Sequence, residues 1–234
     1  MCLYLGLFFH LVIYMLRYSW DYMSRRFKNL VCDIGVYDFS KPIIENTEPV
    51  GTIKTSLKTL FFGDTSKFSY MLKLSNRTQS PILDHVIGLT KDFENVDEVL
   101  IRIQTNPWRY STHFDTYDQT ILMLDGFKRW IFFRTQFDSV EDEKNFIQFV
   151  NGLQFGNLKN FLKSKKIPYH LKISKPGDQF FIPRGMYHAI ENVNQGRGTI
   201  FINIIHTGED DDINERFSYI WPTVTSKCEE GVYY

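Results

Sequence analysis

The stretch HFDTYDQTILMLDGFKRW, residues 113–130, holds the features that decide the fold of this chain. An apolar run over 120–124 is followed by Asp125-Gly126, and a second apolar run covers 127–133. An Asp-Gly pair between two apolar runs is a strong signal for a β-hairpin. This stretch therefore predicts two strands that are joined by a tight turn.

Other short apolar segments lie on both sides of this stretch, and glycine or proline separates most of them. They cover residues 99–103, 169–173, 179–182, 187–193 and 199–206. Between them, the apolar spacing over 140–164 predicts one or two helices. Many short strands with frequent turn residues indicate a sandwich or a barrel, so we expect a mainly β fold with helical additions.

The chain of 234 residues is long enough for one domain with a small appendage. We expect a hydrophobic N-terminal segment with a basic flank over 1–28. A mixed region over 29–98 then packs on the barrel. The barrel itself covers 99–234 and carries a helical insertion near 138–166.

The N-terminal segment is uncharged from residue 2 to residue 16, and Arg17 follows it. That run is short for a bilayer-spanning helix of about 20 residues, although the aromatic residues at 18–20 can extend it into the interface. We expect a membrane anchor over residues 2–20. The basic residues that follow it place the rest of the chain in the cytosol. The alternative is a packed or partner-bound helix in a cytoplasmic protein.

Composition argues against several classes of function. The chain has 27 basic residues (Lys and Arg) and 27 acidic residues (Asp and Glu). Because there is no excess of positive charge, there is no strong signal for a nucleic-acid partner. The three cysteines are far apart and predict neither a disulfide framework nor a zinc knuckle. The sequence also lacks a serine-hydrolase nucleophile elbow and a glycine-rich phosphate loop.

Candidate metal ligands come from two separated blocks. In a strand, His113 and Asp115 would point to the same face. His188 begins a later apolar run, after a Pro-x-Gly turn. Two imidazoles and one carboxylate form the facial triad of non-haem Fe(II) oxygenases. The alternatives are that His113 is a surface-loop residue and that His188 is a satisfied core histidine.

Two further polar residues stand in apolar strands. Lys128 alternates with Trp130, and a lysine on a buried face is costly unless it meets an anion. Alternation alone leaves open whether Lys128 or Arg129 points inward. Asn203 needs a hydrogen-bond partner if it is buried.

From residue 113 onward the chain resembles the cupin superfamily and, within it, the Jumonji-C (JmjC) oxygenases. The pattern G-x5-P-x-G-x2-H-x3-N of cupins is present from Gly177 to Asn192. The block over 113–130 is similar to that of asparaginyl hydroxylases such as factor inhibiting hypoxia-inducible factor. The aspartate at position 115 favours an oxygenase over other cupins. The implied fold is a double-stranded β-helix, a jelly roll.

The resemblance also implies the cofactors and the site. Fe(II) is bound by His113, Asp115 and His188. Lys128 binds the far carboxylate of the co-substrate 2-oxoglutarate.

Three further positions match polar co-substrate contacts of similar enzymes. Gln119 and Asn203 fall directly at such positions. Tyr110 stands where some relatives have a threonine.

The implied activity is an Fe(II)- and 2-oxoglutarate-dependent dioxygenase of the hydroxylase or demethylase type. It consumes O2 and hydroxylates a side chain of a protein substrate. The alternatives are a non-catalytic cupin-like metal-binding or interaction module, and an oxygenase that acts on RNA or on a small molecule.

Overall fold

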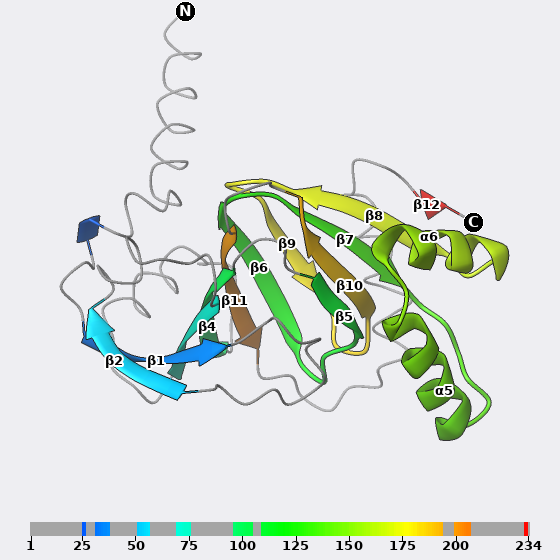
Figure 1. Ribbon diagram of the computed structural model, residues 1–234, viewed down its shortest axis with the longest axis horizontal. Coiled ribbons are helices and arrows are strands. Elements are labelled where there is room, and N and C mark those ends of the chain that lie inside the picture. Colours follow the sequence, from blue (N-terminus) through cyan, green and yellow to red (C-terminus); the bar gives the residue numbers. More distant parts are fainter. Residues whose placement is uncertain are drawn as a thin grey trace, which may run out of the picture.

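Two antiparallel sheets face each other and enclose the core of the protein, as Figure 1 shows for the computed structural model. The structure describes residues 25–26, 31–37, 51–56, 69–75, 96–104, 109–193, 199–206 and 232–233. The seven-stranded sheet contains, in spatial order, β2 (Gly51–Ser56), β1 (Val31–Tyr37), β3 (Ser69–Ser75), β4 (Val96–Gln104), β11 (Thr199–His206), β6 (Asp118–Asp125) and β9 (Gln179–Ile182). The five-stranded sheet contains β12 (Val232–Tyr233), β8 (Tyr169–Ser174), β7 (Lys128–Phe133), β10 (Tyr187–Asn192) and β5 (Arg109–His113).

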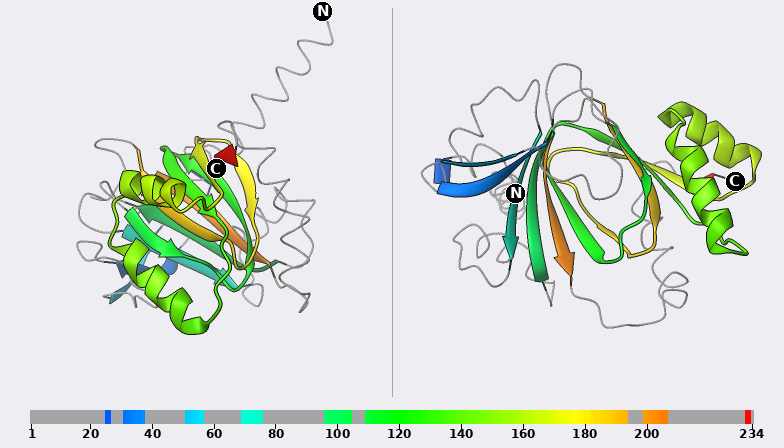
Figure 2. Two further views of the ribbon diagram at one scale, coloured as in Figure 1. Left: turned by 90° about the vertical axis from the view of Figure 1, so that its right-hand side faces the viewer. Right: turned by 60° about the horizontal axis from the view of Figure 1, so that its bottom comes forward.

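The strands from β4 to β11 form a jelly roll. Successive strands alternate between the two sheets, except that β7 and β8 are neighbours in the five-stranded sheet. The right-hand view of Figure 2 shows the two sheets curving around a common interior. This alternation is the double-stranded β-helix that the sequence predicts, so the fold class is confirmed.

The predicted hairpin at Asp125-Gly126 is wrong, although the turn itself is present. Gly126 has a φ of 76°, and its N–H donates to Asp125 Oδ1 at 2.8 Å. β6 pairs with β11 and β9, whereas β7 pairs with β10 and β8. The turn therefore carries the chain from one sheet to the other. Nearly every residue of both strands is buried, so the apolar pattern gives no information about which strands pair.

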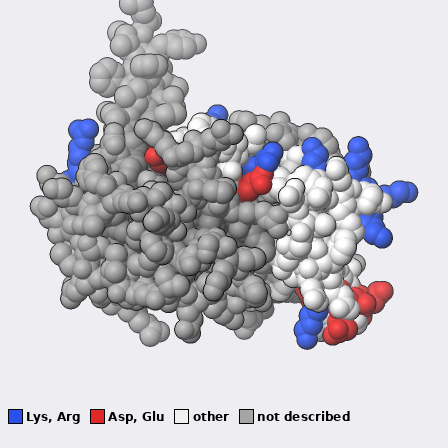
Figure 3. All heavy atoms as spheres, viewed as in Figure 1, with Lys and Arg blue, Asp and Glu red and all other residues white. Residues whose placement is uncertain are grey.

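Two helices lie between β7 and β8, where the sequence predicts one or two. They are α5 (Val140–Asn151) and α6 (Phe155–Ser164). Ser139 caps α5 by accepting a hydrogen bond from the Asp142 N–H at 3.1 Å. Figure 2 shows both helices on the outer face of the five-stranded sheet. Their buried side chains pack against it. Figure 3 shows acidic side chains at the start of α5 and lysines near the end of α6.

The core divides into two apolar clusters. One fills the interior between the sheets and consists of Ile121, Met123, Trp130, Phe132, Phe180, Ile182, Met186, Ile190 and Phe201. The other lies under the helices and includes Ile131, Phe133, Tyr169, Leu171, Tyr187 and Ala189. Strand β7 contributes alternate residues to the two clusters. It therefore ties the helical layer to the barrel.

Several expectations for the N-terminal part remain untested. The predicted anchor over residues 2–20 lies outside the described residues. Within the described part of the chain, no helix has both the length and the apolar character that crossing a membrane requires. The division of the chain at residues 28 and 98 stays a prediction. The sequence pattern did not indicate the strands β1 to β3, β5 and β12.

Candidate metal centre

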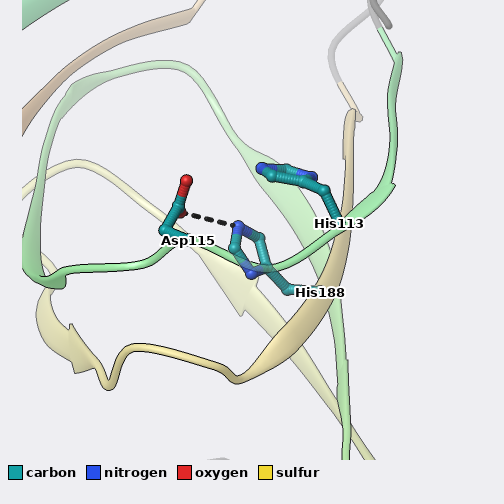
Figure 4. Close-up of side chains that lie close together, drawn as sticks. All are labelled: His113, Asp115 and His188. Atoms are coloured by element: carbon teal, nitrogen blue, oxygen red, sulfur yellow. Dashed lines mark ion pairs between the residues drawn. The ribbon is translucent and has the colours of Figure 1, made fainter. Parts of the chain in front are cut away.

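Three of the predicted site residues come together at one end of the barrel. His113 is the last residue of β5, and it lies directly opposite His188 of β10 in the strand pairing. Their ring centroids are 4.3 Å apart. Each of His113, Asp115 and His188 offers one ligand atom, and these three atoms lie within 4.8 Å of one another (Figure 4). The structure thus brings two imidazoles and one carboxylate together from separate parts of the sequence.

Asp115 reaches this cluster from a loop, because β5 ends at His113. The alternation of a strand is therefore not what orients it. The Gly185 N–H donates to the Asp115 backbone carbonyl at 2.8 Å, and the Arg184 N–H donates to Asp118 Oδ1 at 2.9 Å. These hydrogen bonds join the loop after β5 to the turn before β10. Gly185 has a φ of 76°, which glycine adopts without strain.

A hydrogen bond orients the His188 ring and leaves its Nε2 directed at Asp115. Its Nδ1 is 2.9 Å from the Met186 carbonyl oxygen, which can only accept, so Nδ1 carries the proton. The other ring nitrogen, Nε2, is 3.6 Å from Asp115 Oδ2, which is too long for a hydrogen bond. Two ligands about 2.1 Å from one ion are at most roughly 4 Å apart, so this pair fits a shared cation. A carbonyl that fixes the tautomer is the usual support for a metal-binding histidine.

Gln119 and Asn203 form a chain of amides that ends on Asp115. Asn203 Nδ2 donates to Gln119 Oε1 at 2.7 Å, and Gln119 Nε2 donates to Asp115 Oδ2. Both amides are buried. The partner that a buried Asn203 requires is thus Gln119. Contacts of these two residues with a co-substrate stay a prediction.

Lys128 points into the barrel. The sequence pattern left open whether Lys128 or Arg129 does so. Its side chain is 0% exposed, whereas Arg129 is exposed and pairs with Glu191. Lys128 Nζ donates to Gln104 Oε1 and lies 4.0 Å from the centroid of the Phe201 ring. Burial lowers the pKa of Lys128 well below its ordinary value, and the positive charge of Arg102 adds to this effect. A carboxylate beside this amine would favour its charged form and offset the cost of burial.

One predicted site residue, Tyr110, and the other histidines of the chain remain to be placed. Tyr110 is within β5, opposite Ile190, and its side chain is outside the described part of the structure. His206 forms a hydrogen bond of 3.0 Å with Thr120, and His170 is buried in β8. Neither His206 nor His170 belongs to the cluster around Asp115. His10 and His85 fall outside the described residues.

An aromatic layer backs the candidate metal centre. Phe114 meets the ring of Tyr187 edge-on at a centroid distance of 5.2 Å, and Tyr187 stacks on Phe133 at 5.3 Å. The Tyr187 hydroxyl donates to Glu143 of α5. Burial raises the pKa of Tyr187, and Glu143 raises it further. Phe114 and Tyr187 each adjoin a candidate ligand in the sequence, so this layer holds both ligand-bearing segments from behind.

Arg102, Gln104 and Glu143 are the neighbours that sequence reasoning missed. Arg102 and Gln104 are polar residues two positions apart at the end of an apolar strand, and this was the signal that could have indicated them. Glu143 had no such signal, because it lies in an acidic helix start.

The fold and the site define a cupin-type β barrel with a candidate facial metal centre. Residues 91–199, a little under half of the chain, match the family described as the JmjC domain. The predicted resemblance to this group is confirmed over these residues. The closer likeness to factor inhibiting hypoxia-inducible factor stays a prediction.

Solved structures of YcfD, a ribosomal oxygenase from Escherichia coli, are similar to this chain. Its complex with cobalt and 2-oxoglutarate is 13% identical with a TM-score of 0.44, and the match covers 92% of this chain and 50% of that one. Its complex with cobalt and succinic acid is 13% identical with a TM-score of 0.45, with the same coverage of both chains. The chain thus spans about half the length of the structures it matches. No curated protein matches the sequence.

Proposed function

We propose that this protein is an Fe(II)- and 2-oxoglutarate-dependent oxygenase. The observation that carries the proposal is the convergence of His113, Asp115 and His188 inside a JmjC jelly roll. Two neutral imidazoles and one carboxylate leave positions of an octahedral ion free for other ligands. This donor set suits Fe(II).

In this proposal each residue of the site has a distinct task. The triad holds Fe(II), which supplies the oxidative chemistry when it is bound together with 2-oxoglutarate and O2. Lys128 binds the distal carboxylate of 2-oxoglutarate and so orients the co-substrate. The amides of Gln119 and Asn203 hold the Asp115 carboxylate in the direction of the ion.

For the substrate we propose a side chain of another protein. The support is precedent: in the JmjC group, hydroxylation of a protein side chain is the leading known reaction. Hydroxylation of an N-methyl group, which ends in demethylation, uses the same arrangement of residues. An unbiased search for proteins that gain one oxygen atom in the presence of the enzyme distinguishes these outcomes.

The activity itself can be tested without the substrate. We expect purified protein to bind Fe(II) under anaerobic conditions and to release succinate from 2-oxoglutarate after air is admitted. Asp115→Asn removes both properties, whereas Asp138→Asn, at an exposed aspartate, retains them. Metal binding without succinate release would indicate a non-catalytic binding module. Unchanged metal binding in Asp115→Asn would remove this residue from the site.

A further inference from the structure

A second cation lies near Lys128 on the inner face of the barrel. Arg102 of β4 is paired directly with Phe201 of β11. Residues that are directly opposite each other in an antiparallel pair share a face. Phe201 belongs to the interior cluster, and Lys128 Nζ lies over its ring. Arg102 and Lys128 therefore approach the same interior surface from two different strands.

The guanidinium of Arg102 has unused hydrogen-bonding capacity. The residue as a whole is half-buried, but its Nε is buried and has no hydrogen-bond partner. A buried donor without a partner costs free energy, and an anion is the partner that arginine favours. This nitrogen is thus placed for a ligand that the protein itself does not supply.

Gln104 contributes a neutral contact beside the two cations. It is two residues from Arg102 on the same strand, and its Oε1 accepts from Lys128. An amide oxygen satisfies a donor but does not balance a charge. The proximity of Arg102 also disfavours the charged form of Lys128. A single carboxylate between the two cations would meet both requirements.

We propose that Arg102 and Lys128 together bind one carboxylate, and that Arg102 thereby selects a diacid co-substrate over a monoacid. The identity of the ligand rests on the proposed function, in which this group is the distal carboxylate of 2-oxoglutarate. Arginine presents a planar fork of N–H donors that matches a carboxylate, whereas lysine adds a point charge. Because Arg102 is half-buried and Lys128 is fully buried, the carboxylate lies toward the more open side of the lysine.

The test compares acids that differ only in the distal group. The affinity of the Co(II)-loaded protein for 2-oxoglutarate and for 2-oxopentanoate is measured by calorimetry, and glutarate is titrated into the metal-free protein. Arg102→Gln weakens binding of 2-oxoglutarate and glutarate roughly ten- to hundredfold. It leaves 2-oxopentanoate and Co(II) affinity unchanged, which also shows that the variant is folded. Arg102→Lys retains part of the preference, and Arg25→Gln, at an exposed arginine, retains all of it.

The outcomes separate this inference from the proposed function. Unchanged diacid affinity in Arg102→Gln overturns the inference while the oxygenase proposal stands. Arg102-dependent binding of glutarate by a protein that fails to bind metal leaves the inference in place and overturns the oxygenase proposal. A wild-type protein that binds no diacid in either form overturns both.

Discussion

Asp115 lies in a loop, so its carboxylate depends on neighbouring side chains for its direction. The amide of Gln119 supplies that support, and Asn203 holds Gln119 in turn. At the residue scale this makes Gln119 a positioning residue for the candidate metal centre. Its contribution is separable from that of the ligands themselves.

We expect Gln119→Leu to weaken Co(II) affinity roughly ten- to hundredfold, because a carboxylate that loses its supporting hydrogen bond is held less firmly. The visible spectrum of bound Co(II) should also shift, which a general loss of stability would not cause. Gln148→Leu, at an exposed position of α5, serves as the matched control. Equal affinity and an identical spectrum in Gln119→Leu would contradict this role.

Residue-scale prediction from sequence succeeded where polar groups stand out against apolar neighbours. Lys128 and Asn203 drew attention in this way, and both are buried. The pairing of Gln104 with Lys128 could not be predicted, because it joins strands that are far apart in the chain. The inward direction of Lys128 also required the fold, since both faces of β7 are apolar.

At the scale of elements, a polar contact joins the helical layer to the site. Tyr187 of β10 donates to Glu143 of α5, and Tyr187 adjoins the candidate ligand His188. The position of α5 is thereby coupled to the strand that carries this histidine. Buried apolar side chains of both helices also pack against this sheet.

We expect Tyr187→Phe to lower the free energy of unfolding by about 1 kcal/mol, because Glu143 loses its donor. Since the folded state raises the pKa of Tyr187, this contribution is complete below the ordinary value of 10.0 and is lost as pH rises above it. Urea unfolding at neutral and alkaline pH measures both effects. A double-mutant cycle with Glu143→Gln isolates the contact, and a coupling energy near zero would show that it adds no stability.

A cap at the start of α5 gives a second prediction at this scale. Ser139→Ala removes the oxygen that accepts from the Asp142 N–H, so we expect a loss of roughly 0.5–2 kcal/mol in stability. Hydrogen exchange should increase in the first turn of α5 and remain unchanged in β7. Equal exchange in the two proteins would show that the cap is dispensable.

Most strand positions could be predicted because turn residues bound each apolar run. The predicted segments at 179–182 and 199–206 coincide with β9 and β11. The pairing at Asp125-Gly126 could not be predicted, because a turn residue does not indicate whether the chain stays in one sheet. β5 lacks a long apolar run, so its existence depends on pairing with β10.

At the scale of the whole molecule, the buried amine of Lys128 makes the stability of the protein depend on pH and on ligands. The pKa of Lys128 is lower in the folded protein than the ordinary 10.5 of the unfolded chain. Between these two values the unfolded state binds more protons, so stability rises with pH. The ligand-free protein thus carries a cost that a bound carboxylate would offset.

We expect the double variant Lys128→Met, Gln104→Leu to be at least as stable as the wild-type protein without ligand, because both polar partners are removed together. Its advantage should shrink as pH rises toward 10.5. Glutarate should stabilise the wild-type protein in thermal unfolding and leave the double variant unaffected. A pH dependence that is the same in both proteins would contradict the account of Lys128.

The jelly roll could be predicted as a whole because the motifs at its site resemble those of the cupin superfamily, which has this fold. The sequence could not place the helices over the five-stranded sheet, since both sheets present apolar outer faces. Leu72, Val99 and Ile202 are buried on the outer face of the seven-stranded sheet. That face therefore also carries buried apolar side chains.

The most direct test of the central claim is anaerobic equilibrium dialysis against Fe(II). We expect the wild-type protein to bind one iron per chain, and His113→Ala, Asp115→Ala and His188→Ala each to lose it while remaining folded. If any of these variants retains iron with wild-type affinity, the three side chains do not form one metal centre, and the proposed oxygenase chemistry has no place in this protein.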